Sequence, residues 1–212
     1  MKKKIFPLLI LVGFGFLIQG CRKDVLKNLD DDDARVYITK YDSSVNFSNY
    51  QTFRLADSVS VVRDGQLVRH DLTTYDAALL SAISQQMVQR GFQLETDQTK
   101  VPDLGIQVSR ITTEYTGVVS YNDYWGGYDS YWDPFYWGYG GYGYSFPYAF
   151  GTYTFREGAL SIDMLDLKNP DTGANQLRSV WTGLGRGTGI FNTNNVAEIV
   201  QTLFDQSGYL NR

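Results

Sequence analysis

The chain has 212 residues, of which 43% are hydrophobic and 15% aromatic, and its formal net charge is −4 at pH 7. Its 19 Lys and Arg residues are outnumbered by 23 Asp and Glu residues, and it contains a single His. Phosphate contacts need clustered cationic side chains, so this balance argues against a nucleic-acid partner. One His also excludes a metal site built from several imidazoles.

The N-terminus has the organisation of a bacterial secretory signal. Lys2–Lys4 precede an apolar run over Ile5–Ile18, which is too short for a stable membrane-spanning helix. Residues 17–21, LIQGC, resemble the lipobox of bacterial lipoproteins. The resemblance implies that residues 1–20 are a lipoprotein signal peptide and that Cys21 is lipidated. The alternative is an ordinary cleaved signal followed by an incidental cysteine.

Segment 21–35, CRKDVLKNLDDDDAR, is typical of an acidic tether, because the run Asp30–Asp33 repels itself and favours an extended chain. Acidic residues after a lipidated Cys also resemble the surface-export signals of some Bacteroidota lipoproteins, although here Arg22 and Lys23 come first. We therefore expect an outer membrane lipoprotein that is held on the membrane through Cys21. A periplasm-facing and a surface-exposed position both stay open.

Residues 36–212 are numerous enough for a single α+β domain with its own core. Alternating apolar residues over Val36–Leu55 predict extended structure, and Asp64-Gly65 predicts a hairpin turn. In 73–92 apolar residues recur at intervals of three and four, which indicates an amphipathic helix.

The ends of this helix and the elements after it can also be predicted. Thr73 or Thr74 can cap the helix, and Gly91 suits its C-terminal end. Residues 104–111 alternate as a half-buried strand. The other predicted elements are two strands at 160–164 and 179–182, and a closing helix over 196–204 with a capping box formed by Asn195 and Glu198.

The order strand, helix, three strands, helix predicts an α+β two-layer sandwich. Its sheet should be mainly antiparallel and four-stranded, with both helices on one face. A long aromatic and Gly-rich hairpin insertion at 121–150 would interrupt it.

Several stretches in this order resemble the bacterial lipoprotein family called domain of unknown function 4136. They are VNFSNYQTFRL, AISQQMVQRGF, VPDLGIQVS, EGALSIDMLDL, VWTGLG and AEIVQTLF. The resemblance covers most of residues 40–205. It implies a βαβββα fold and supplies no catalytic residues.

The polar residues do not form a recognisable catalytic or metal set. His70 and Asp71 are interpreted as a solvated surface pair. Asp163 is expected on the solvent face of its strand, and Asp166 at the start of a turn on the opposite face. We therefore expect no catalytic residue, cofactor or metal.

Two other patterns resemble binding motifs only in part. Three acidic residues of the insertion lack the spacing of an EF-hand calcium loop: Asp123, Asp129 and Asp133. The run GLGRGTG at 183–189 lacks the features of a phosphate-binding loop and is interpreted as a Gly-rich strand end.

The insertion YNDYWGGYDSYWDPFYWGYGGYGYSFPYAF has three interpretations. Its rings could pack on the domain as a long hairpin, bind a glycan or another envelope component, or enter the lipid interface. Eight rings are the candidate ligand contacts: Tyr124, Trp125, Tyr128, Tyr131, Trp132, Tyr136, Trp137 and Tyr139.

We expect a non-enzymatic, lipid-anchored cell-envelope protein that binds an envelope component or glycan through this insertion. The alternative is a structural or assembly lipoprotein that acts through protein–protein contacts of the sheet edge or the helices. A hydrolase that uses His70, Asp163 and Asp166 is a third option.

Overall fold

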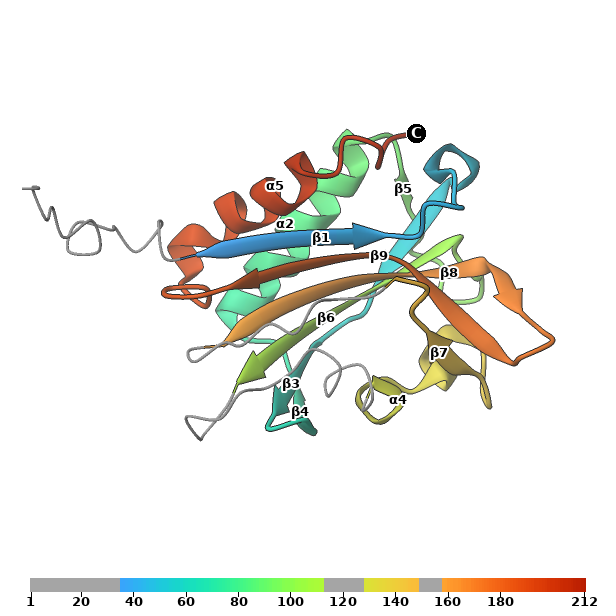
Figure 1. Cartoon of the computed structure of the whole chain (residues 1–212), viewed down its shortest axis with the longest axis horizontal. Coiled ribbons are helices and arrows are strands. Elements are labelled where there is room, and N and C mark those ends of the chain that lie inside the picture. The colour runs from blue at the N-terminus through green and yellow to red at the C-terminus, as the bar shows by residue number, and fades with distance from the viewer. Residues whose placement is uncertain (1–34, 113–127, 149–157) are drawn as a thin grey trace, which may run out of the picture. The chain divides into compact units, whose positions relative to one another are not determined.

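The protein is described from a computed structural model that covers residues 35–112, 128–148 and 158–212 (Figure 1). Its strands are β1 Val36–Tyr41, β2 Thr52–Leu55, β3 Val59–Arg63, β4 Gln66–Asp71, β5 Gln93–Leu94, β6 Leu104–Thr112, β7 Gly143–Ser145, β8 Ala159–Asp171 and β9 Gln176–Arg186. Its helices are α2 Thr74–Gln89, α4 Tyr128–Tyr131 and α5 Val196–Asp205, with short 3-10 turns η2 Phe47–Asn49, η3 Pro134–Trp137 and η4 Thr193–Asn195.

These strands form one mixed nine-stranded sheet rather than the expected four-stranded one. The main order is β1-β9-β8-β6-β2-β5, with β3 also beside β6, β4 beside β3, and β7 beside β9. The pairs among β1, β9, β8 and β6 are antiparallel, whereas β2 and β3 run parallel to β6. The expected first strand is divided because Asn46 caps η2, and this turn separates β1 from β2.

The predicted hairpin turn and first helix are confirmed. Asp64 and Gly65 have φ angles of 48° and 74°, and they join β3 to β4. Thr73 and Asp76 form a reciprocal capping box at the start of α2, and Gly91, with φ of 92°, follows its end.

The predicted cap of the last helix is wrong. Asn195 precedes α5 but makes no side-chain capping hydrogen bond. Asn192 instead accepts a hydrogen bond from Asn194 N at 3.0 Å and caps the preceding turn η4. The chain thus enters α5 directly from a 3-10 turn, which leaves Asn195 in a helical conformation.

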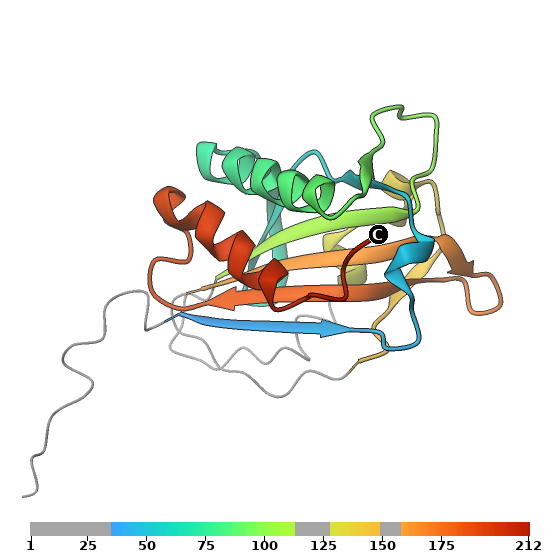
Figure 2. The same cartoon turned by 90° about the horizontal axis from the view of Figure 1, so that it is seen from above.

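Both longer helices lie side by side on one face of the sheet (Figure 2). The apolar stripe of α2 contributes Leu79, Ile83 and Met87 to the core. They pack with apolar residues of α5 and of the central strands, including Trp181 of β9. Within the described residues, no helix is both long and apolar enough to cross a membrane.

A second apolar core covers the other face of the sheet. It joins α4, η3 and β7 to residues such as Leu165 and Leu167 of β8. Strand β6 is therefore buried on both faces, and the prediction that it is half-buried is wrong. At Gly105 a Cβ atom would lie 2.9 Å from Leu167 Cδ1 and 3.1 Å from the Trp137 ring, so the aromatic segment packs directly on the sheet.

The described part of the insertion is therefore a third layer, not a simple hairpin. After α4 and η3, strand β7 pairs in parallel with β9. The remaining insertion residues, 121–127 and 149–150, lie outside the described part of the chain.

Candidate functional site

The centre of the insertion is a short, doubly capped turn with the sequence WDPFYWG. Asp133 caps η3 by accepting a hydrogen bond from Phe135 N at 2.9 Å, and Pro134 occupies its first position. Gly138 ends the turn with φ of 84°, in the left-handed region that glycine adopts without strain. These local signals hold the backbone of residues 133–138 in one conformation.

This turn divides its aromatic side chains between the core and the solvent. Trp132 and Trp137 are both 3% exposed and belong to the second core. Phe135 is 73% exposed and Tyr136 is 38% exposed. A Cβ atom at Gly140 would collide with the Phe135 ring, so the absence of a side chain at Gly140 leaves room for the ring in this position.

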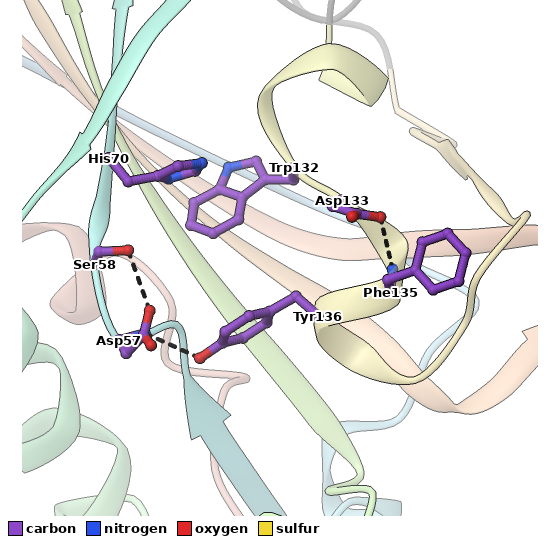
Figure 3. Close-up of a pocket in the computed structure, with 7 residues that line it drawn as sticks. All are labelled: Asp57, Ser58, His70, Trp132, Asp133, Phe135 and Tyr136. Carbon is purple, nitrogen blue, oxygen red and sulfur yellow. Dashed lines mark hydrogen bonds between the residues drawn. The ribbon is translucent and has the colours of Figure 1, made fainter.

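The exposed rings border a cavity of about 490 Å³ between η3 and the β3–β4 hairpin, which we call the Phe135 pocket (Figure 3). It is lined by Asp57, Ser58, His70, Trp132, Asp133, Phe135 and Tyr136. Asp57 and Ser58 directly precede β3, and His70 lies in β4. The pocket volume falls within the usual range of small-molecule sites.

One hydrogen bond connects the two sides of the pocket, and a second joins two neighbouring residues on one side. Asp57 N donates to Tyr136 Oη at 3.0 Å, and Ser58 Oγ donates to Asp57 Oδ1 at 3.1 Å (Figure 3). Burial and, next, the Asp57 carboxylate raise the pKa of Tyr136. The Tyr136 hydroxyl therefore stays neutral and can donate a hydrogen bond.

His70 is exposed to solvent as predicted, but it lines the pocket and does not pair with Asp71. Its Nδ1 is 3.3 Å from Ser60 Oγ, and its ring centre is 5.5 Å from that of Trp132. The Asp71 carboxylate accepts hydrogen bonds from Arg69 and Arg110 instead. Because Ser60 is fully buried, the Ser60–His70 contact does not present a nucleophile to a ligand.

The eight rings predicted to bind a ligand are in different environments. Four are buried: Tyr128, Tyr131, Trp132 and Trp137. Tyr139 is half-buried, and its hydroxyl donates to the Leu167 carbonyl oxygen. Tyr124 and Trp125 lie outside the described residues. Tyr136 is the described member of the set that is exposed at the pocket, and Trp132 forms part of its wall.

The two strand carboxylates are buried, and the predicted solvent exposure of Asp163 is wrong. Asp163 accepts hydrogen bonds from Ser161 and Thr182, and the aromatic layer covers this face. Asp166 accepts a hydrogen bond from Tyr50 Oη at 2.7 Å and lies 3.7 Å from Arg178. It lies within β8 and not at the start of the turn.

Among the described residues, no group of three or more His, Cys, Asp or Glu side chains is arranged to hold a metal ion. Asp123 and the side chain of Asp129 lie outside the description. Asp133 caps η3. Gly183 and Gly185 lie inside β9, which confirms the Gly-rich strand end.

Sequence reasoning missed Phe135, Asp57 and Ser58 as pocket residues. The Asp-Pro pair at 133–134 is a local signal for a capped turn, but it does not indicate which of the following rings is exposed. Asp57 and Ser58 are brought to the site by long-range packing of the β3–β4 hairpin against η3, for which the sequence has no local signal.

The fold and the site together define a mixed α/β domain with an aromatic, acidic pocket on the face opposite its helices. The chain belongs to the family described as domain of unknown function (DUF4136), whose family model matches residues 38–208. A crystal structure of a DUF4136 family protein from Bacteroides thetaiotaomicron is similar, with 32% identity and a TM-score of 0.70. The match covers 85% of this chain and 99% of the other.

Two further solved structures are more distant. A PDZ domain protein from Parabacteroides distasonis has 15% identity and a TM-score of 0.41, with 84% of this chain and 37% of the other covered. A PelC dodecamer from Paraburkholderia phytofirmans has 7% identity and a TM-score of 0.39, with 84% and 98% covered. Similarity at this level supports no inference about function. A search of curated proteins gave no match.

Proposed function

We propose that this protein is a non-enzymatic, lipid-anchored cell-envelope protein that binds a glycan in the Phe135 pocket. The observation that carries the proposal is the exposure of Phe135 and Tyr136 beside the pocket's hydrogen-bonding groups. Apolar faces of sugar rings stack on aromatic side chains, while their hydroxyls need nearby donors and acceptors. Asp57, Ser58 and Asp133 supply those polar groups.

The rigidity of the aromatic turn supports a binding role. Phe135 and Tyr136 lie on a 3-10 turn that is capped at both ends. The turn is also held in the second core by Trp132 and Trp137. A ligand would therefore meet rings that are already ordered, which lowers the entropy lost on binding.

The pocket chemistry favours binding over hydrolysis. Asp57 and Asp133 are exposed to water, whereas the general acid of a glycosidase typically lies in an apolar pocket. Ser60, next to His70, is buried. The protein should accordingly bind sugar chains and release them uncut.

The proposed site can be tested with the purified full chain in detergent and a panel of cell-wall and polysaccharide fragments. Stacked aromatic contacts contribute about 0.5–1.5 kcal/mol each, so the double substitution F135A/Y136A should weaken binding by about 1–3 kcal/mol. The control is Tyr41→Ala, because Tyr41 is a 39% exposed ring outside the pocket. Unchanged affinity in the double variant would refute the site, and release of shortened sugar chains would refute the non-enzymatic role.

The lipid anchor is a separate part of the proposal and rests on the sequence around Cys21. Wild-type protein should incorporate labelled palmitate and fractionate with the outer membrane, whereas a Cys21→Ser variant should do neither. Protease treatment of intact cells distinguishes a surface-exposed domain, which is digested, from a periplasm-facing one, which is protected. Equal labelling of both proteins would contradict lipidation at Cys21.

A second candidate function is assembly with another protein through α2. Asp76 is the single charged residue of this helix, and it is buried. A shallow depression of about 470 Å³ on the helix is lined by Ser81, Ser84, Gln85, Val88 and Gln89. A photo-cross-linking residue at position 85 should capture a discrete partner if this face binds one.

A further inference from the structure

We infer that the Phe135 pocket selects a sugar that carries a free ammonium group, an amino sugar, over its neutral and anionic counterparts. This inference rests on the proposed function, because it specifies which class of glycan the same pocket takes. It depends on the charges in the pocket wall and on the aromatic faces beside them.

Two pocket carboxylates have no cationic partner among the described residues. Asp57 uses Oδ1 to accept from Ser58 Oγ, and Asp133 uses Oδ1 to accept from Phe135 N. Neither carboxylate forms an ion pair within the described part of the chain, and neither Oδ2 atom has a hydrogen bond there. By contrast, Asp71 has two arginine partners at 3.2 and 3.0 Å.

The described wall of the pocket contains no Lys or Arg that would neutralise these carboxylates. Among the causes that shift the Tyr136 pKa, Arg54 is the one cation, and its lowering effect is the smallest of them. The Arg54 guanidinium is held by the backbone carbonyl oxygens of Glu95, Asp97 and Lys100. The titratable side chains of the described wall are thus Asp57, Asp133, His70 and Tyr136, and the two carboxylates disfavour a bound sugar carboxylate or phosphate.

The rings of the pocket suit a cation as well as an apolar sugar face. Trp132 and Tyr136 both line it, and the indole lies between His70 and Tyr136 (Figure 3). The negative faces of such rings attract ammonium groups. Trp132 is only 3% exposed, so Phe135 and Tyr136 present the ring area that a bound sugar can reach.

A sugar fits this arrangement better than a lysine side chain. The cavity has a volume of about 490 Å³, and two exposed rings lie at its edge. A single extended alkyl chain would leave most of this volume empty. A sugar ring can cover Phe135 or Tyr136 while its amine faces Asp57 or Asp133. The pocket should therefore distinguish an amino sugar from a peptide of equal charge.

The test compares two oligosaccharides that differ in charge, the tetramer of β-1,4-linked glucosamine and its fully N-acetylated counterpart. Calorimetry with the full chain, at a mildly acidic pH where the glucosamine amines are protonated, should give tighter binding of the charged tetramer. Each exposed charge pair contributes roughly 0.2–1 kcal/mol, so two carboxylates should give about two- to thirtyfold. Added salt should reduce the difference, because these charges are exposed to solvent.

Two isosteric variants assign the selectivity to the carboxylates. Asp57→Asn and Asp133→Asn remove charge, and Asn still caps η3, so the fold should persist. The combined variant should bind both tetramers with equal affinity. Asp171→Asn is the matched control, since Asp171 is an exposed carboxylate at the end of β8, accepts a backbone hydrogen bond through Oδ1 as Asp133 does, and does not line the pocket.

The outcomes separate this inference from the proposed function. Equal affinity of the wild type for both tetramers would overturn the inference and leave glycan binding intact. Binding of neither tetramer, nor of any other glycan tested, would overturn both. A lysine peptide of equal charge that binds as tightly as the glucosamine tetramer would show attraction by charge alone and would also overturn the inference.

Discussion

Replacing Trp137 by Ala tests whether the aromatic insertion is part of the domain core. Trp137 is 3% exposed and packs against Gly105 at the centre of the sheet. A buried aromatic side chain of this size removes about 150–250 Å² from water, which corresponds to about 4–6 kcal/mol at ~25 cal/mol per Å². Measured Trp-to-Ala substitutions in cores cost about 3–5 kcal/mol, so we expect a loss in this range.

Phe135→Ala is the matched control, because Phe135 lies on the same 3-10 turn but is 73% exposed. Its free energy of unfolding should change by about 0.5 kcal/mol or less. Urea denaturation followed by circular dichroism measures both variants against the wild type, with the slope m checked for constancy. A loss below about 1 kcal/mol for Trp137→Ala, at unchanged m, would refute packing of the insertion on the sheet.

Three further results are expected. Gly140→Ala should displace the Phe135 ring and weaken glycan binding without removing any aromatic group, as titration calorimetry would show; unchanged affinity would argue against a positioned ring. Arg110→Met should cost about 3 kcal/mol in urea denaturation, because the fully buried Asp76 carboxylate loses a partner at 2.9 Å; a neutral effect would contradict this. Burial raises the pKa of Tyr50 and that of Tyr75 above 10.0. Their contribution to stability is present below the unfolded pKa of about 10 and is lost as pH rises through the higher folded values. Ultraviolet titration should show delayed ionisation relative to urea-unfolded protein, and coincident curves would refute it.

The sequence predicts those elements whose signals are local. The helix with Thr73 at its start and Gly91 after its end follows from capping and periodicity. The turn at Asp64 and Gly65 follows from the preference of these residues for positive φ. Both are confirmed because neighbouring residues in the chain determine them.

Elements that depend on distant packing could not be predicted in this way. Asp163 looks solvent-exposed in an alternating strand, because nothing local indicates that an aromatic layer covers that face. His70 looks like a surface partner of Asp71, yet Asp71 is held by Arg110 from β6. The rings of 132–137 have no simple period, so the division between buried Trp137 and exposed Phe135 requires the three-dimensional turn.

The aromatic insertion can combine packing and binding because both tasks use the same short turn. Burial of Trp132 and Trp137 fixes the turn on the sheet, and the caps at Asp133 and Gly138 fix its backbone. The rings that project outward are consequently ordered before a ligand arrives. Loss of an inward ring should therefore reduce both stability and binding, whereas loss of outward Phe135 should reduce binding alone. The same capped turn at residues 133–138 thus packs on the sheet through its inward rings and presents its outward rings to a ligand.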